Sequence, residues 1–357
     1  MLGAALTAVG SPYAIMVAGR FIFGVSEGAI FIALVAGLAQ WFSRSGIALA
    51  TALYLSLARA GSYAVDTSTA WARPLYERGW QAPLWLGTGI AVAGLMAATL
   101  FYGLDRRYRP RAGSAIAVVA PAPAAHTPAT GVADRSGLGH LLRFDLSYWY
   151  ILALHVLYAA VFFPFRTTYA IEYFQHVKGL TLKQAGVANS WVFFAAIFAT
   201  PFFGLLADRL GHRALMLTFG TLLLPVTFAI LGLTNLNLWV STVMMGISFS
   251  LVPAVIWPAT TLIVEPRRLG TALGLITLIQ ALGLAASNLA AGWIADQAGA
   301  GAENPAGYAV MMWFFFLLSL VALSSALLLW RRETGPDGHG LEDARSSRRL
   351  RSEMRLS

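Results

Sequence analysis

Ionisable residues inside long apolar stretches are the features of this sequence best suited to chemistry. Glu27 and Arg59 each stand about midway along such a stretch, and the two stretches are consecutive in the chain. A charge held in hydrocarbon is costly, so it indicates a function by default. At similar depth, the two side chains could hold the ends of a small zwitterion, with Arg59 forking onto a carboxylate. The alternative is that they pair with each other and only join two helices.

Three further charged residues lie in apolar stretches. Arg20 precedes Glu27 by seven residues, so both lie on one face of a helix. Asp66 follows Arg59 by seven residues, so these two also lie on one face of a helix. Arg20 is expected either to pair with Glu27 or to reach the interface by snorkelling, and Asp66 has the same two interpretations. Arg166 lies near the end of its stretch, which favours a snorkelling or gate residue over a substrate ligand.

Polar and aromatic side chains in the C-terminal half could line a cavity, although polar groups in hydrocarbon also join neighbouring helices. The candidates are Tyr158, Asn189, Trp257, Gln280 and Asn288. Trp257 is the best placed, because Pro258 after it is expected to break the helix and free carbonyl groups beside a cavity. His155 is interpreted as an ordinary hydrogen-bonded helix residue.

The composition indicates a membrane protein. Hydrophobic residues make up 58% of the chain and charged residues only 11%, whereas soluble proteins carry about 25% charged residues. Cysteine is absent, which excludes a disulfide framework and cysteine-ligated metals. The net charge of +9 comes largely from arginines in loops and in the tail. That distribution is typical of the cytoplasmic side of a membrane protein rather than of a nucleic-acid-binding protein.

Nine stretches are long enough to cross a bilayer, since a span needs roughly 20 residues. They are residues 13–41, 47–70, 82–103, 147–172, 185–207, 213–233, 237–263, 269–294 and 307–330. Residues 1–10 are apolar but too few to cross, and we interpret them as the end of a span that begins upstream. If the sides alternate from a cytoplasmic linker, most arginines fall in the cytoplasm, which favours that orientation.

Residues 104–146 differ in composition and divide the chain. They combine arginines with the run AVVAPAPAAHTPATG, which is typical of a flexible linker. We expect an incomplete N-terminal bundle of about three and a half spans over 1–103 and a cytoplasmic linker over 104–146. A six-helix bundle over 147–332 and a basic cytoplasmic tail over 333–357 should follow.

A short repeat adds a family resemblance. GLLADRLG, residues 204–211, recurs as GWIADQAG, residues 292–299, and this period suits the repeats of secondary transporters. The longer segment GLLADRLGHR resembles the signature loop of the major facilitator superfamily. The resemblance implies a loop that latches helix ends and controls inward- and outward-open states, with glycines that allow close helix approach and the turn. The gating candidates are Arg20, Gly204, Asp208, Arg209, Gly211 and Arg213.

Within that superfamily, the chain resembles the lysosomal dipeptide-transporter branch. The matching segments, in order, are GRFIFG, LSLARAGS, VFFPF, IWP and LGTALGLITLIQALGLA. Arg59 occupies the position of the arginine of that branch. The acidic residue of the branch falls one step after Glu27, at Gly28, and one step turns a helical side chain by about 100°.

The expected fold is an all-α membrane protein of the major facilitator type: two pseudo-symmetric six-helix bundles, the N-terminal one truncated in this chain. The expected function is alternating-access transport of small zwitterionic solutes, most readily dipeptides. The alternatives are an organic-anion or sugar permease, and a receptor or assembly subunit that binds without transporting. No enzyme, metal or nucleotide motif is present in the sequence, so we expect no catalysis and no cofactor.

The expected surroundings are a lipid bilayer and a small dipeptide-like solute, with no nucleic acid. The sequence leaves open whether an accessory subunit is needed. A composition rich in Ala, Gly and Arg suggests a bacterial inner membrane, and a lysosomal membrane would follow if the source were an animal.

Overall fold

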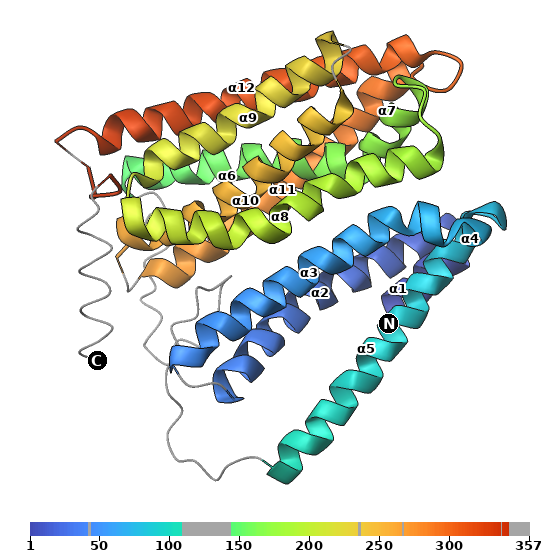
Figure 1. The fold of residues 1–357 in the computed structure, drawn as a ribbon, viewed down its shortest axis with the longest axis horizontal. Coiled ribbons are helices and arrows are strands. Elements are labelled where there is room, and N and C mark those ends of the chain that lie inside the picture. The colour runs from blue at the N-terminus through green and yellow to red at the C-terminus, as the bar shows by residue number, and fades with distance from the viewer. Residues whose placement is uncertain (42–43, 109–143, 235–236, 266–267, 337, 343–357) are drawn as a thin grey trace. The chain divides into compact units, whose positions relative to one another are not determined.

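The computed structural model describes residues 1–41, 44–108, 144–234, 237–265, 268–336 and 338–342 (Figure 1). Every regular element in these ranges is helical, which confirms the all-α prediction. The first five helices are α1 (Leu2–Val9), α2 (Tyr13–Trp41), α3 (Arg44–Trp71), α4 (Arg73–Glu77) and α5 (Gln81–Tyr108). Most of the predicted linker and tail lies outside the described residues.

The second group of elements begins after the linker. It comprises α6 (Leu146–Pro164), the π-helix η2 (Phe165–Tyr169), α7 (Ala170–His176), α8 (Leu182–Leu210), α9 (Arg213–Leu233), α10 (Leu238–Ile263), α11 (Leu269–Gln297), the 3-10 helix η4 (Pro305–Gly307) and α12 (Tyr308–Glu333). The chain contacts define two compact units. Unit 1 contains Met1–Tyr54 and Ser68–Ala120, and unit 2 contains Leu55–Thr67 and Pro121–Ser357. The middle of α3 therefore belongs to unit 2.

Seven of the nine predicted spans are confirmed in the described residues as helices of sufficient length and hydropathy to cross a membrane. They comprise α5, the continuous run of α6 to α7, and α8 to α12. In α2, Tyr13–Ser26 forms a shorter apolar segment that ends where the side chains of residues 27–29 lie outside the described residues. The described part of α3 is not among the seven, and it contains Arg59, Asp66 and several Ser and Thr residues.

In unit 1, the short helix α1 packs against α2 and α5. The contact with α2 is close, because a Cβ atom built on Gly3 would lie 2.6 Å from the carbonyl oxygen of Gly19. Thr7 completes the contact, and its hydroxyl donates to the Gly3 carbonyl at 2.8 Å. Small residues at this crossing let the two helix backbones approach closely, as is usual between membrane helices.

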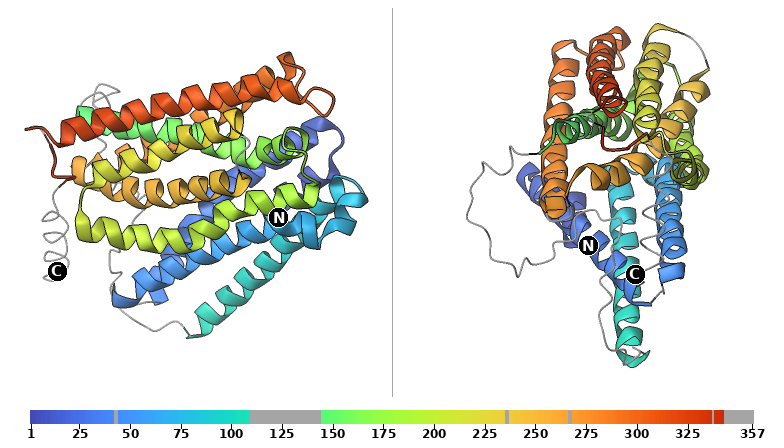
Figure 2. Two further views of the ribbon diagram at one scale, coloured as in Figure 1. Left: turned by 45° about the horizontal axis from the view of Figure 1, so that its top comes forward. Right: turned by 90° about the vertical axis from the view of Figure 1, so that its left-hand side faces the viewer.

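Unit 2 is a helical bundle (Figures 1 and 2). Helix α10 packs against both α8 and α9, α6 packs with α11 and α12, and α12 also contacts α9. The start of α8 is set by a capping box in which Thr181 and Gln184 satisfy each other's backbone N–H groups. Asp145 caps α6 by accepting from the N–H of Ser147 at 2.8 Å. Local sequence thus determines where these helices begin.

The backbone at two prolines, Pro258 and Pro164, shows where the helices are regular and where they are not. The prediction that Pro258 breaks its helix is wrong, because α10 runs without interruption through both Pro253 and Pro258. A proline removes one hydrogen bond and kinks a helix, but in a membrane bundle neighbouring groups can re-satisfy the carbonyls. The hydroxyl of Thr261, for example, donates to the Pro258 carbonyl at 2.8 Å. The irregular backbone follows Pro164 instead, where α6 passes into η2.

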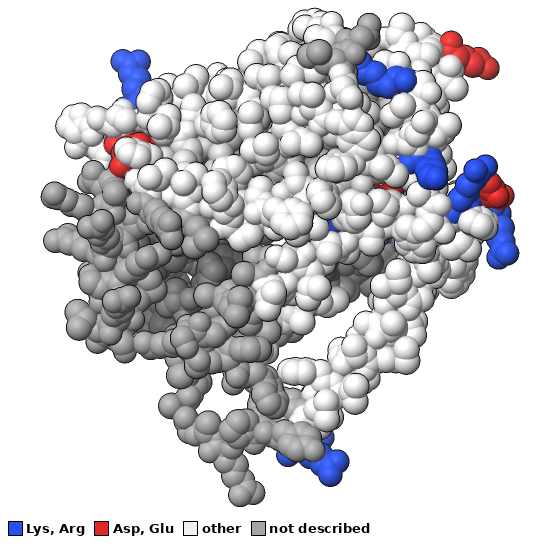
Figure 3. All heavy atoms as spheres, in the orientation of Figure 1, with Lys and Arg blue, Asp and Glu red and all other residues white. Residues whose placement is uncertain are grey.

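The surface agrees with a lipid environment. Nearly all of the described surface visible in Figure 3 is uncharged. Large apolar side chains are exposed along the spans, among them Phe198 at 64%, Leu289 at 76% and Trp293 at 66%. Such exposure is unfavourable in water and ordinary in a bilayer.

Candidate functional site

The arginine singled out by the sequence faces an aromatic ring. The guanidinium carbon of Arg59, on the α3 segment of unit 2, lies 4.0 Å from the centroid of the Phe249 ring on α10. Phe249 stacks on Phe162 of α6 at 4.4 Å between centroids. A cation held over a ring face is stabilised by its quadrupole, more strongly where water is scarce. The ring positions the arginine without neutralising it, and no described carboxylate contacts Arg59.

The second arginine of this region is neutralised. Arg166 projects from η2 and forms an ion pair with Asp66 of the α3 segment. Both side chains are largely buried, with 4% and 11% of their surfaces exposed, and the Arg166 guanidinium also lies 3.7 Å from the centroid of the Phe193 ring. The snorkelling interpretation of Arg166 is therefore wrong. Asp66 pairs with an arginine a hundred residues away in the chain, and its hydrogen bond to that residue joins α3 to η2.

Arg59, Arg166 and Asp66 together carry an excess of positive charge. Arg59 has both Arg166 and the phenol of Tyr158 as electrostatic neighbours. Two guanidinium groups and one carboxylate, that of Asp66, thus carry a net charge of about +1 in this part of unit 2, since arginine stays protonated in proteins. A region of low dielectric with one uncompensated cation attracts an anion, such as a substrate carboxylate.

Tyr158 belongs to a buried hydrogen-bond chain. The hydroxyl of Ser248 donates to the Gly220 carbonyl at 2.7 Å, and the Tyr158 hydroxyl lies 3.0 Å from the same Ser248 oxygen. Because the serine proton is already used, Tyr158 must donate to Ser248. The chain joins α6, α10 and α9 and holds the phenol in place. Sequence reasoning missed Ser248, since a small hydroxyl in an apolar stretch carries no distinguishing signal.

Trp257 and Gln280 meet at a histidine that sequence reasoning set aside. Nε2 of His155 lies 2.9 Å from Oε1 of Gln280, and the His155 and Trp257 rings meet edge to face at 5.1 Å. His155 is only 7% exposed, and its Nδ1 has no hydrogen-bond partner among the described residues. The structure therefore brings two predicted cavity residues together on α10 and α11, with His155 of α6 between them.

The two candidate asparagines contact the π-helix. The Asn189 side chain, on α8, donates to the Arg166 carbonyl at 3.4 Å. On α11, the Asn288 carbonyl accepts from the Tyr169 hydroxyl at 2.9 Å, and its side-chain oxygen accepts from Thr168 at 3.1 Å. A π-helix leaves backbone groups irregularly paired, and these contacts hold it between two neighbouring helices.

The candidates on α2 belong to unit 1. Glu27 lies within α2, but its side chain is outside the described residues. Arg20 lies on the same helix, is exposed, and forms no ion pair with a described residue. The pairing of Arg20 with Glu27, and the role of Glu27 beside Arg59, stay predictions.

The signature loop connects α8 to α9. Gly211 ends α8 with φ 73°, a conformation that favours glycine, and His212 follows with φ 40°. Arg213 begins α9 and is 3% exposed. A Cβ built on Gly204 meets no described atom within 4 Å, and the role of Gly204 in close helix approach stays a prediction. The side chains of Asp208 and Arg209 lie outside the described residues.

Residues 338–342 fold back onto this loop. Leu341 is fully buried, and its carbonyl accepts from the N–H of Arg213 at 2.9 Å. The Glu342 carboxylate accepts from the N–H of Leu215 at 3.0 Å and from Nδ1 of His212 at 2.9 Å. His212, the N-cap residue of α9, makes no side-chain cap hydrogen bond. The Glu342 carboxylate instead accepts from a free N–H group in the first turn of α9.

The same end of unit 2 contains a cluster around the end of α12. The fully buried Glu333 carboxylate accepts from the Ser147 hydroxyl and from the N–H of His339, both at 2.7 Å. Arg332 donates to Asp145 at 2.9 Å. Burial alone would raise the pKa of Asp145, but hydrogen bonds from the Ser147 N–H and from Arg332 outweigh it and lower the pKa. These contacts tie the end of α12 to the start of α6.

Bilayer-length helices around buried charged groups define a membrane transporter of the helical-bundle class. Residues 151–355, more than half of the chain, match the Major Facilitator Superfamily. The chain belongs to this family, and it is a multi-pass membrane protein that transports small solutes as a secondary transporter, not an enzyme.

Individual relatives extend the match to nearly the whole chain. The protein named Lysosomal dipeptide transporter MFSD1 of Danio rerio is 28% identical over 97% of this chain and 72% of its own length. The Homo sapiens protein of the same name is 26% identical over 99% of this chain and 72% of its own length. Monocarboxylate transporter 6 of Homo sapiens is 25% identical over 94% of this chain and 68% of its own length.

Proposed function

We propose that this transporter carries small zwitterionic peptides, and that Arg59 binds the substrate carboxylate. The observation that carries the proposal is the contrast between two arginines. Arg166 is neutralised by Asp66, whereas Arg59 rests on the Phe249 ring with no described carboxylate partner. A substrate carboxylate would supply the missing counter-charge through a bidentate hydrogen-bonded contact. The relatives named as dipeptide transporters support the same substrate class.

The amine end of the substrate is assigned to Glu27. Its position halfway along α2 matches the depth of Arg59 in the sequence pattern. The aromatic and polar wall of the cavity is assigned to Tyr158, Asn189, Trp257 and Gln280. Apolar surface with few directing polar groups binds varied side chains, so the peptide termini should dominate recognition.

The proposed mechanism is alternating access between two helical bundles joined by residues 104–146. The signature-loop residues Asp208, Arg209 and Arg213 would latch helix ends in one state and release them in the other. Residues 338–342 contact the same loop, so they would hold that end of unit 2 as one body during the motion. A bacterial inner membrane is the proposed location.

A second candidate is an organic-anion permease. The net positive charge around Arg59 favours any carboxylate, and the similarity to a protein named as a monocarboxylate transporter points in the same direction. The two candidates differ in their need for a substrate amine.

Uptake into proteoliposomes separates these candidates. A radiolabelled dipeptide is offered with a matched set of competitors: the free dipeptide, its N-acetylated form and its C-amidated form. The zwitterion proposal expects both modifications to weaken competition by roughly 10- to 100-fold, as for a lost charge-assisted hydrogen bond. An anion permease would tolerate acetylation and reject amidation. Equal competition by all three forms would remove both candidates.

A further inference from the structure

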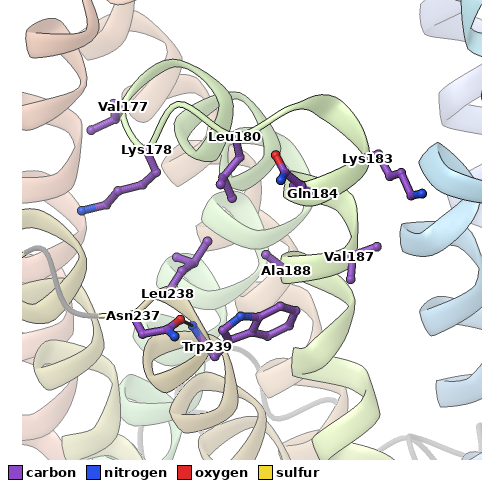
Figure 4. Close-up of a pocket in the computed structure, with 10 residues that line it drawn as sticks. All are labelled: Val177, Lys178, Leu180, Lys183, Gln184, Val187, Ala188, Asn237, Leu238 and Trp239. Carbon is purple, nitrogen blue, oxygen red and sulfur yellow. Dashed lines mark hydrogen bonds between the residues drawn. The ribbon is translucent and has the colours of Figure 1, made fainter.

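A hollow at one end of unit 2 is lined by basic and apolar residues but by no acid. It has a volume of about 620 Å³ and lies between the α7–α8 turn and the first turn of α10 (Figure 4). Its lining residues are Val177, Lys178, Leu180, Lys183, Gln184, Val187, Ala188, Asn237, Leu238 and Trp239. With no Asp or Glu in this described lining, the hollow favours negatively charged ligands.

Its two basic residues are unusual for this chain. Lys178 and Lys183 are the only lysines in the sequence, and every other basic residue that counts toward its charge is an arginine. Figure 4 places them at opposite ends of the hollow, with Leu180 and Gln184 between them and the Lys183 side chain pointing away from the other lining residues. Lys178 Nζ donates to the Thr234 carbonyl at 3.1 Å. Neither lysine pairs with a described carboxylate, so both charges are available to a ligand.

The ends of the neighbouring spans indicate that the hollow lies at the depth of the lipid headgroups. One membrane span ends at His176, the next begins at Leu182, and a third begins at Leu238. The turn that carries Lys178 is therefore at the ends of neighbouring spans, level with the bilayer surface. Trp239 is 39% exposed beside it, and tryptophan is enriched at that depth.

A second, mainly apolar hollow adjoins the first. It has a volume of about 130 Å³, and Val177 lines both. Its other lining residues come from α7, α9, η4 and α12, and include Phe228, Leu233, Met312, Trp313 and Phe316. The Lys178 ammonium donates a hydrogen bond to the carbonyl of Thr234, the residue directly after Leu233. The cation therefore lies beside both hollows, at the edge of an apolar groove.

We propose that an anionic phospholipid binds at this position, with its phosphate on the ammonium of Lys178 and an acyl chain in the apolar hollow. Lys183 adds to the positive potential from the other end. A lysine ammonium acts as a compact point charge for phosphate. A free phosphate ion would satisfy the charge but would leave the apolar lining unused, which is why the geometry favours a lipid. This site is separate from Arg59 and does not depend on the transported solute.

Amine acetylation of the unaltered protein tests the proposal directly. The chain has two lysines, and both line this hollow. Mass spectrometry of the two peptides that contain them therefore measures lysine acetylation at this site with little signal from other lysines. Only a neutral amine reacts, and burial lowers the pKa of Lys178, so the empty site should react readily. A bound phosphate restores the charged form and shields the amine. The rate is measured in nanodiscs of phosphatidylglycerol and of phosphatidylcholine, and in phosphatidylcholine with added inorganic phosphate.

Phosphatidylglycerol should slow acetylation of Lys178 about fivefold relative to phosphatidylcholine, as expected for a lysine near an anionic lipid. Equal acetylation rates in phosphatidylglycerol and phosphatidylcholine would show that the site does not select an anionic lipid, which would overturn the proposal. Protection by inorganic phosphate alone would show a free-anion site, which overturns it too. Unchanged rates in all conditions would contradict any ligand at this lysine.

Two variants provide a second readout. In detergent, phosphatidylglycerol should raise the Tm of the wild-type protein and of Lys178→Arg, which keeps the charge, but not that of Lys178→Gln. Lys183→Gln serves as the matched control, because it removes the other lysine and should lose only part of the shift. An equal shift in Lys178→Gln and wild type would refute the assignment of the phosphate to Lys178.

Discussion

Arg59 and Arg166 are the same residue type in opposite electrostatic situations. Arg166 has Asp66 as a counter-charge, whereas among the described residues Arg59 contacts the face of Phe249 and no carboxylate. The sequence located all three charges but left Asp66 either paired with Arg59 or reaching the interface, because helix spacing describes one helix at a time. A partner on another helix, a hundred residues away, has no periodic signature. Ser248 was missed for the same reason, because its significance comes from neighbours on other helices.

At Arg59, lysine should not substitute for arginine. Arg59→Lys keeps the positive charge but loses the planar fork that grips a carboxylate. We expect dipeptide uptake in proteoliposomes to fall roughly 10- to 100-fold, the equivalent of one lost charge-assisted hydrogen bond. Size-exclusion profiles should stay monodisperse, because the cation over Phe249 is retained. Near wild-type uptake by this variant would show that the fork is not used.

The Asp66–Arg166 pair should matter for stability. Asp66→Asn leaves Arg166 buried without its counter-charge, and such a loss typically costs about 3–5 kcal/mol. The double variant Asp66→Asn/Arg166→Gln removes both charges and should recover much of the lost thermal stability in detergent. If the double variant is as unstable as the sum of the two single variants, the residues do not act as a pair.

At the scale of helices, the span pattern was predictable and the irregularities were not. Length and hydropathy locate α5 to α12 because a bilayer demands some twenty apolar residues in a row. The same reasoning placed a break at Pro258, where α10 is continuous, and not at Pro164, where η2 begins. Whether a proline breaks a helix depends on which neighbouring groups can take over its hydrogen bonds, and that information is tertiary.

The segment after α12 should stabilise unit 2. Leu341 is fully buried against the bundle, so Leu341→Ala should cost about 2–5 kcal/mol, as in other buried leucine truncations. Leu327→Ala, on the exposed side of α12 (44% exposed), is the matched control and should change little. Thermal unfolding in one detergent compares the two. Equal loss of stability in both variants would show that residues 338–342 are not docked in solution.

The cap of α6 should give a pH signature. Hydrogen bonds from the Ser147 N–H and from Arg332 depress the pKa of Asp145 in the folded state, against the opposing effect of burial. A depressed pKa means that the carboxylate stabilises the fold above its unfolded pKa of about 3.9. This contribution is lost as the pH falls through the lower, folded value. Wild type should therefore exceed Asp145→Asn in Tm by a constant margin above about pH 5, narrowing below about pH 4. A margin that persists unchanged to the lowest pH would contradict a role for the charge.

For the whole molecule, substrate binding and folding stability are linked. A ligand that binds only the folded state stabilises it by about 2.7 kcal/mol at a hundred times its Kd, enough to raise the Tm by several degrees. If Arg59 holds the substrate carboxylate, a free dipeptide should raise the Tm of wild type, a C-amidated dipeptide should raise it less, and neither should stabilise Arg59→Gln. Arg268→Gln, at the start of α11, removes an arginine elsewhere and should respond as wild type does. Because this measurement needs no transport, it separates binding from turnover. A dipeptide shift that is the same in Arg59→Gln and in wild type would place the carboxylate elsewhere in the protein, whatever the uptake data show.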